Sequence, residues 1–291
     1  MLTTRRNWLQ AILASGILVP WSSIRAASHE PVKVALLESV FAGQDRDKVV
    51  EQIKPFAEII QKDTKTDAVF DVVTLSQVES EFKTGKIQLV ILTGLEYAWL
   101  QVAYPEAKAL LVASIDEGST RTVVVTKESD TAKDLKDLSG AKVAIPDRIP
   151  FVSQYYLQAT LGQPLDKAFQ QKKSGNVDET LEEVLDGNAR AAIVTGAGME
   201  VFKERKPGRF KKLKAIHTSM DFPPATVMYN EKHADKDALA KFKDALLKSN
   251  EKPEGARVLT LYKLKGFEEV PAGFEQKVKE VAKAYPRKSQ G

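Results

Sequence analysis

From Pro31 onwards, short apolar runs rich in β-branched residues alternate with amphipathic stretches of helical period. Residues 32–37 form the first run, and in residues 45–62 apolar side chains then recur every three or four positions. This alternation is typical of βα units built around largely parallel sheets. The sequence therefore predicts an α/β fold in which helices flank each sheet.

A first lobe is predicted from the units that follow Pro31. Its strands are expected at 32–37, 69–74, 89–92 and 109–114, and its helices at 45–62, 76–85 and 94–103. Ser76 is followed three residues later by Glu79, the spacing at which two side chains cap the start of a helix reciprocally. Gly85 is expected to end that helix.

A second lobe of the same type is predicted for residues 121–217. Strands are expected at 122–125, 142–145, 191–194 and 213–217, and helices at 133–138, 151–161, 178–185 and 198–204. Two segments, 118–120 and 218–224, are polar, glycine-bearing or proline-rich, and we interpret them as crossings between the lobes. Only one strand, 225–229, is predicted after the second crossing, so residues 222–291 are expected to complete the first lobe of residues 31–117.

Composition excludes several classes of protein. The chain has no cysteine, which rules out disulfides, thiolate metal sites and a cysteine nucleophile. The net charge of +4 includes Arg5, Arg6 and Arg25, and without these three the charge is close to zero. A nearly neutral chain argues against nucleic acid as a partner.

The first 26 residues are typical of an export signal. Arg5 and Arg6 precede an apolar run from Ala11 to Val19, and small residues at 26–28 offer a cleavage site. The run is too short to span a bilayer. A twin-arginine signal is our preferred interpretation, and an ordinary secretory signal with two arginines is the alternative. Both predict a periplasmic protein.

Three stretches resemble one family of exported proteins. They are residues 89–97 (LVILTGLEY), residues 137–144 (DLSGAKVA), and residues 175–178 (GNVD) ahead of 184–192 (VLDGNARAA). Together with a discontinuous first lobe, they resemble the type 2 periplasmic solute-binding proteins of the phosphate, phosphite and phosphonate group. The resemblance implies two lobes that close on a ligand by hinge motion and an ABC transporter as partner. One stretch departs from the family: residues 146–153 (PDRIPFVS) replace its serine/threonine-glycine run and keep only Ser153 as a hydroxyl.

Candidate ligand-binding residues follow from the expected fold, because ligands of open α/β sheets bind beyond the carboxyl ends of strands. The residues just after each strand are Glu38, Ser39 and Phe41 in the first unit; Thr93, Gly94, Glu96 and Tyr97 in the third; Arg148, Phe151, Ser153 and Tyr155 in the second lobe; and Asn176 and Thr195 later in it.

Each candidate also has a structural alternative. Arg148 is suited to gripping an anion, but it is equally suited to pairing with Glu38, Glu96 or Asp147. The aromatic residues Tyr97, Phe151 and Tyr155 would enclose a ligand or pack in the core. The acidic residues at strand ends, Glu38 and Glu96, argue against a naked, highly charged anion. They suit a ligand that carries an amine, or they cap a helix.

Enzyme chemistry finds little support in the sequence. His29, His217 and His233 lack ligand spacing, and no serine lies in a Gly-x-Ser-x-Gly turn. We expect no cofactor, no metal and no catalysis. The predicted function is capture of a small anionic or zwitterionic solute for an ABC permease by a monomeric protein. An accessory or sensor protein of the same fold, acting with a membrane kinase or a periplasmic enzyme, is the alternative.

Overall fold

The computed structural model describes residues 31–41 and 44–287. The predicted export signal, residues 1–26, lies outside these described residues. Among the helices described, none combines the length and the apolar character that a membrane crossing requires.

The first lobe contains a six-stranded sheet of order β11-β4-β10-β3-β1-β2. Its strands are β1 (Val32–Leu37), β2 (Ala68–Val73), β3 (Leu89–Leu92), β4 (Ala107–Ser114), β10 (Thr226–Asn230) and β11 (Gly266–Glu268). Strand β1 runs parallel to β2 and β3, whereas β10 is antiparallel to both β3 and β4. The sheet therefore places β10, which follows the second crossing, between β3 and β4, which precede the first.

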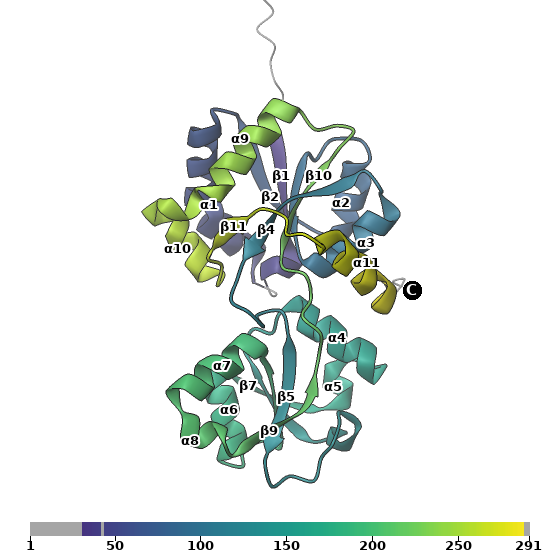
Figure 1. Ribbon diagram of the computed structural model, residues 1–291, viewed down its shortest axis with the longest axis vertical. Helices are drawn as coiled ribbons and strands as arrows, with labels where there is room; N and C mark the ends of the chain where they lie inside the picture. Colours follow the sequence, from purple (N-terminus) through teal and green to yellow (C-terminus); the bar gives the residue numbers. More distant parts are fainter. Residues whose placement is uncertain (1–30, 42–43, 288–291) are drawn as a thin grey trace, which may run out of the picture. The chain divides into compact units, whose positions relative to one another are not determined.

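Helices cover both faces of this sheet (Figure 1). One face carries α1 (Arg46–Thr64), α9 (Lys236–Leu247) and α10 (Pro253–Leu261), and the other carries α2 (Leu75–Phe82), α3 (Gly94–Ala103) and α11 (Phe274–Ala284). The apolar positions predicted in the first helix, Val49, Ile53, Phe56 and Ile60, are all buried against the sheet. A short 3-10 helix, η1 (Glu38–Phe41), follows β1 directly.

The second lobe contains a five-stranded sheet of order β7-β6-β8-β5-β9. Its strands are β5 (Thr122–Lys127), β6 (Lys142–Pro146), β7 (Gln170–Ser174), β8 (Ala191–Thr195) and β9 (Leu213–Thr218). Helices α4 (Phe151–Leu161) and α5 (Leu165–Ala168) lie on one face, and α6 (Val177–Leu185), α7 (Gly196–Arg205) and α8 (Pro207–Phe210) lie on the other (Figure 1). Two further 3-10 turns are η2 (Lys136–Leu138) in this lobe and η3 (Ser249–Glu251) in the first.

Both sheets are mixed. Parallel pairing holds for β1 with β2 and β3 and for β6 with β7 and β8, as the alternation predicts. The strands next to the crossings, β5 and β10, pair antiparallel with their neighbours. A chain that leaves one sheet and enters the other need not keep the direction that a βα repeat imposes.

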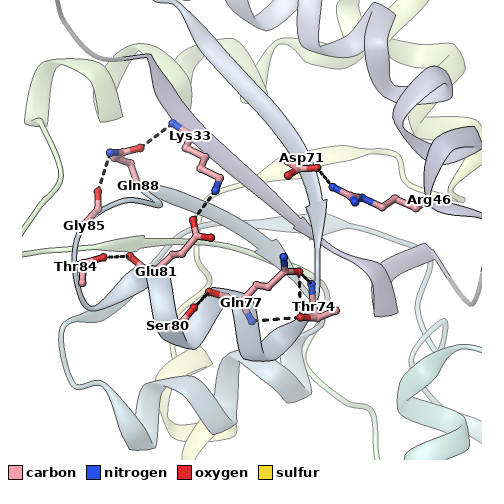
Figure 2. Close-up of polar contacts among 10 residues, drawn as sticks. All are labelled: Lys33, Arg46, Asp71, Thr74, Gln77, Ser80, Glu81, Thr84, Gly85 and Gln88. Carbon is pink, nitrogen blue, oxygen red and sulfur yellow. Dashed lines mark hydrogen bonds and ion pairs between the residues drawn. The ribbon is translucent and has the colours of Figure 1, made fainter.

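The cap of α2 differs from the predicted one. Thr74 Oγ1 accepts from the amide of Gln77 at 3.3 Å, and Gln77 Oε1 accepts from the amide of Thr74 at 2.9 Å (Figure 2). The reciprocal cap is therefore Thr74 with Gln77, and not Ser76 with Glu79. Both pairs have the same spacing, and the end of β2 at Val73 decides between them.

Three other local predictions are corrected. Residues 170–174 form an edge strand, β7, whose polar sequence QQKKS hides it from an apolar pattern. A three-residue strand, β11, adds a second strand after the second crossing. The helix predicted at 133–138 is only the 3-10 turn η2, at residues 136–138.

Candidate functional site

The two crossings between the lobes are joined to each other. The hydroxyl of Thr120 donates to the carbonyl of Phe222 at 2.7 Å, and the amide of Thr122 donates to Ser219 Oγ at 2.9 Å. Arg121 and Asp221 add an ion pair. The two crossings are therefore held together by two hydrogen bonds and an ion pair.

Gly94 sits where the first lobe meets the second crossing. It is the first residue of α3, and a Cβ built there would lie 2.6 Å from two atoms of Pro223, with the Pro223 carbonyl oxygen closer still. Only glycine lets the backbones approach this closely. The absence of a side chain at Gly94 therefore allows α3 to pack directly against Pro223 of the second crossing.

An aromatic cluster connects α3 of the first lobe to α4 of the second. The ring centroid of Trp99 lies 4.8 Å from that of Tyr155 and 6.3 Å from that of Phe151. Trp99 Nε1 donates to the carbonyl of Tyr285 at 2.7 Å, and the Tyr155 hydroxyl donates to the carbonyl of Pro286 at 2.6 Å. The segment after α11 thus contacts residues from both lobes.

Glu96 is a buried carboxylate at the start of α3, only 3% exposed. Its Oε2 accepts from the hydroxyl of Ser39 at 2.6 Å, from the hydroxyl of Thr93 at 2.7 Å and from the amide of Thr93 at 3.2 Å. Burial raises the pKa of Glu96, and these three hydrogen bonds oppose the rise. The cluster fixes Ser39 and η1 against the end of β3.

A pocket of about 380 Å³ lies along α4. We call it the α4 pocket, and it is lined by Ser39 of η1; Ile145, Asp147 and Ile149 of β6 and the following loop; Phe151, Gln154 and Gln158 of α4; Leu165 and Asp166 of α5; and Gln171 and Lys173 of β7. Ser39 comes from the first lobe and the other lining residues come from the second. A ligand beside Ser39 would therefore contact both lobes.

The α4 pocket includes the start of α4. Pro150 occupies the N-cap position and makes no side-chain cap, so no side chain satisfies the first amides of the helix. Such amides bind anions, and the helix dipole adds to the attraction.

Arg148 lies in the loop just before α4, exposed and without an ion pair to any residue that the structure describes. Its predicted pairing with Glu38, Glu96 or Asp147 is not seen among the described contacts. Burial raises the pKa of Tyr262, and the charge of Arg148 opposes that rise. Arg148 is not among the residues that line the α4 pocket.

Several predicted residues lie elsewhere. Phe41 packs edge-on against Tyr262 in the core, and Tyr97 stacks on Phe274 and donates to Glu275. Ser153 is buried and accepts from the hydroxyl of Thr122 at 2.8 Å. These three side chains support the lobes and do not line the α4 pocket.

The remaining predicted residues cap helices or face solvent. Asn176 caps α6 by accepting from the amide of Glu179, and Thr195 caps α7 by accepting from the amide of Gly198. Glu38 is exposed on η1. None of the three is among the residues that line the α4 pocket.

Sequence reasoning missed most of the second-lobe lining. Gln154 and Gln158 lie on a helix face, and Gln171 and Lys173 lie on the unpredicted strand β7. The one available signal is the spacing of Phe151, Gln154 and Gln158, which places them on the same side of α4.

The part of the chain that the structure describes contains no candidate metal-binding site. Residues 31–41 and 44–287 contain no group of three or more His, Asp or Glu side chains placed to hold a metal ion. His217 Nε2 lies 2.6 Å from the Tyr156 hydroxyl, and burial lowers the pKa of His217.

Solved structures share this fold. A Xanthomonas citri protein bound to chloride ion has a TM-score of 0.58 and 14% identity, covering 87% of this chain and 96% of that one. PhnD1 from Prochlorococcus marinus, in complex with methylphosphonate, has a TM-score of 0.54 and 15% identity, covering 87% and 97%. A binding protein component of a Pseudomonas aeruginosa ABC phosphonate transporter has a TM-score of 0.53 and 14% identity, covering 86% and 85%.

Sequence comparison gives the family. No curated protein is similar enough to this chain to match it. Residues 39–272 match the family described as the periplasmic substrate-binding protein of the phosphonate ABC transporter. That match spans both lobes and both crossings. The chain therefore belongs to the phosphonate-type periplasmic substrate-binding proteins of ABC transporters, with the type 2 binding-protein fold.

Proposed function

We propose that this protein captures a small anionic or zwitterionic solute in the α4 pocket, between its two lobes, and presents it to an ABC permease. The observation that carries the proposal is the composition of the pocket wall, which joins Ser39 of the first lobe to the uncapped start of α4 in the second. A ligand that bonds to both lobes favours the arrangement in which both reach it. The joined crossings are where that movement would occur.

The binding groups we propose for the anion are mainly backbone amides. Ser153 is the hydroxyl kept from the family pattern, but it is buried and bonded to Thr122. The first amides of α4 remain for an oxyanion, with the exposed guanidinium of Arg148 in the loop just before the helix. Ser39, whose hydroxyl proton is donated to Glu96, adds a contact from the opposite lobe. Methylphosphonate, the ligand of the Prochlorococcus marinus protein, is thus a reasonable first probe.

Binding without catalysis is the activity we propose. The family match favours transport over the sensor alternative. We further propose that residues 1–26 direct export by the twin-arginine route and that the protein acts as a monomer.

A thermal-shift screen of the full chain tests capture. The panel is phosphate, methylphosphonate and other phosphonates, amino acids and small carboxylates. A true ligand at 100 times its Kd should stabilise the protein by about 2.7 kcal/mol. If no compound of any class stabilises the protein, the proposal is wrong.

Substitution of Arg148 tests the anion grip. Arg148→Ala should reduce the thermal shift given by the ligand, whereas Arg257→Ala, at an exposed arginine of α10, should leave it intact. An equal shift in both variants would assign Arg148 to the solvated surface. Small-angle scattering should also show compaction when the ligand is added, and an unchanged profile would exclude hinge closure.

A further inference from the structure

The α4 pocket extends well beyond the helix start at which an anion would bind. Gln154 and Gln158 follow Phe151 by three and seven residues, so all three share one face of α4. Seven residues of helix span about 10 Å. The pocket volume of about 380 Å³ also falls within the roughly 300–1,000 Å³ of sites for drug-sized ligands.

The opposite wall of the pocket is built by one face of β7. Gln171 and Lys173 alternate with Gln170 and Lys172, so the two pairs point to opposite faces of the sheet. Lys173 lies beside Ile145, its register partner on β6 and another lining residue. On the other face, Lys172 pairs with Glu183 of α6 at 2.5 Å.

The charged side chains of the pocket wall are unpaired among the described residues, whereas those on the side of the sheet that carries α6, α7 and α8 form ion pairs. On that side, Arg205 pairs with Asp178, and Arg209 pairs with Glu182. Within the part of the chain that the structure describes, the lining residues Lys173, Asp147 and Asp166 have no ion-pair partner. Their hydrogen-bonding capacity is available to a ligand.

Three carboxamides dominate the chemistry of this wall. The side chains of Gln154, Gln158 and Gln171 each donate and accept hydrogen bonds, as alcohol hydroxyls also do. Asp166 adds an acceptor suited to neighbouring hydroxyls, and the ring of Phe151 offers an apolar face to the C–H side of a sugar or polyol. Phosphate or methylphosphonate is too small to reach these side chains from the start of α4, so the carboxamides and Asp166 would then form hydrogen bonds with water instead.

We propose that the ligand of the α4 pocket is an anionic ester with a polyhydroxylated tail, such as a sugar or polyol phosphate or phosphonate. The anionic group lies at the start of α4, and the tail lies along the helix between Gln158 and Gln171. This inference rests on the proposed function, because it takes capture of an anion in the same pocket as given.

Isothermal titration of the full chain tests the ligand class. The probes are inorganic phosphate, methylphosphonate, sn-glycerol 3-phosphate and glucose 6-phosphate. Two or more added hydrogen bonds should make at least one hydroxylated ester bind about tenfold or more tightly than methylphosphonate. If inorganic phosphate or methylphosphonate binds best, or if only an amino acid of the thermal-shift panel binds, the tail inference is wrong and solute capture stands. If neither these four probes nor any compound of that panel binds, both are wrong.

Substitutions on β7 provide a matched test. Gln171→Ala should weaken the hydroxylated ester by about fivefold, the loss of one hydrogen bond, and leave methylphosphonate unchanged. Gln170→Ala, at the exposed neighbour on the other face, should change neither affinity. Equal effects of the two variants on the ester would overturn the placement of the tail. Unliganded melting curves should coincide with that of wild type, because both side chains are exposed.

Discussion

Replacing Gly94 with alanine tests how tightly the first lobe holds the second crossing. The added Cβ would lie 2.6 Å from two atoms of Pro223, against 3.4 Å or more in an ordinary contact, so the crossing must move by about 1 Å. The obstructing atoms belong to the backbone and a proline ring, and no rotamer change relieves them. Overpacking of this kind costs about 1–3 kcal/mol.

Gly208 supplies the matched control. It also lies in the first turn of a helix, and a Cβ there would meet nothing within 4 Å. Gly208→Ala should be neutral or stabilise by about 0.4–1 kcal/mol through the unfolded chain. Urea denaturation followed by circular dichroism should separate the two variants. A Gly94→Ala protein within about 0.5 kcal/mol of wild type would refute the close approach.

Three further predictions concern Glu96, the aromatic cluster and the crossings. Burial raises the pKa of Glu96, so the folded state holds its proton more tightly than the unfolded state and stability falls as pH rises above 4.5. Denaturation at several pH values should show Glu96→Gln gaining stability over wild type in that range, and a constant difference would contradict the burial effect. Trp99→Ala should lower the free energy of unfolding by about 3–5 kcal/mol, because the ring is 9% exposed and packs against α4. A loss below about 1 kcal/mol would mean that the aromatic cluster contributes little to stability. The side chains of Arg121 and Asp221 are each about one-third exposed, so a double-mutant cycle should give a coupling of about 0–1 kcal/mol, and a value above about 2 kcal/mol would argue that the pair is effectively buried.

The fold followed from the sequence because strand and helix periods alternate so regularly. The strands that sequence reasoning found are apolar and central, such as β3 and β8, whose core positions are almost fully buried. Strand β7 was not predicted, because an edge strand has only one neighbour and tolerates polar residues such as Lys172 and Lys173 on its faces. Strand β11 was not predicted, because three residues are too few to show the alternating pattern of a strand.

The site was only partly predictable. Reasoning from strand ends led to Ser39 and Phe151, which do line the α4 pocket, but equally to Phe41 and Tyr97, which are core residues. Sequence position cannot decide which way an aromatic residue just after a strand points, because that depends on the helix packed above it. The sequence pattern also could not predict that Gln158 and its neighbours line a pocket. A polar helix face lining a pocket has the same pattern as one facing solvent.

A crystal structure of the full chain with its ligand would test the central claim most directly. The solute that gives the largest thermal shift is the one to crystallise. We predict that the ligand lies in the α4 pocket, with its anionic group within hydrogen-bond distance of the first amides of α4 and a contact to Ser39 from the other lobe. A ligand bound to one lobe alone, or away from α4, would contradict it.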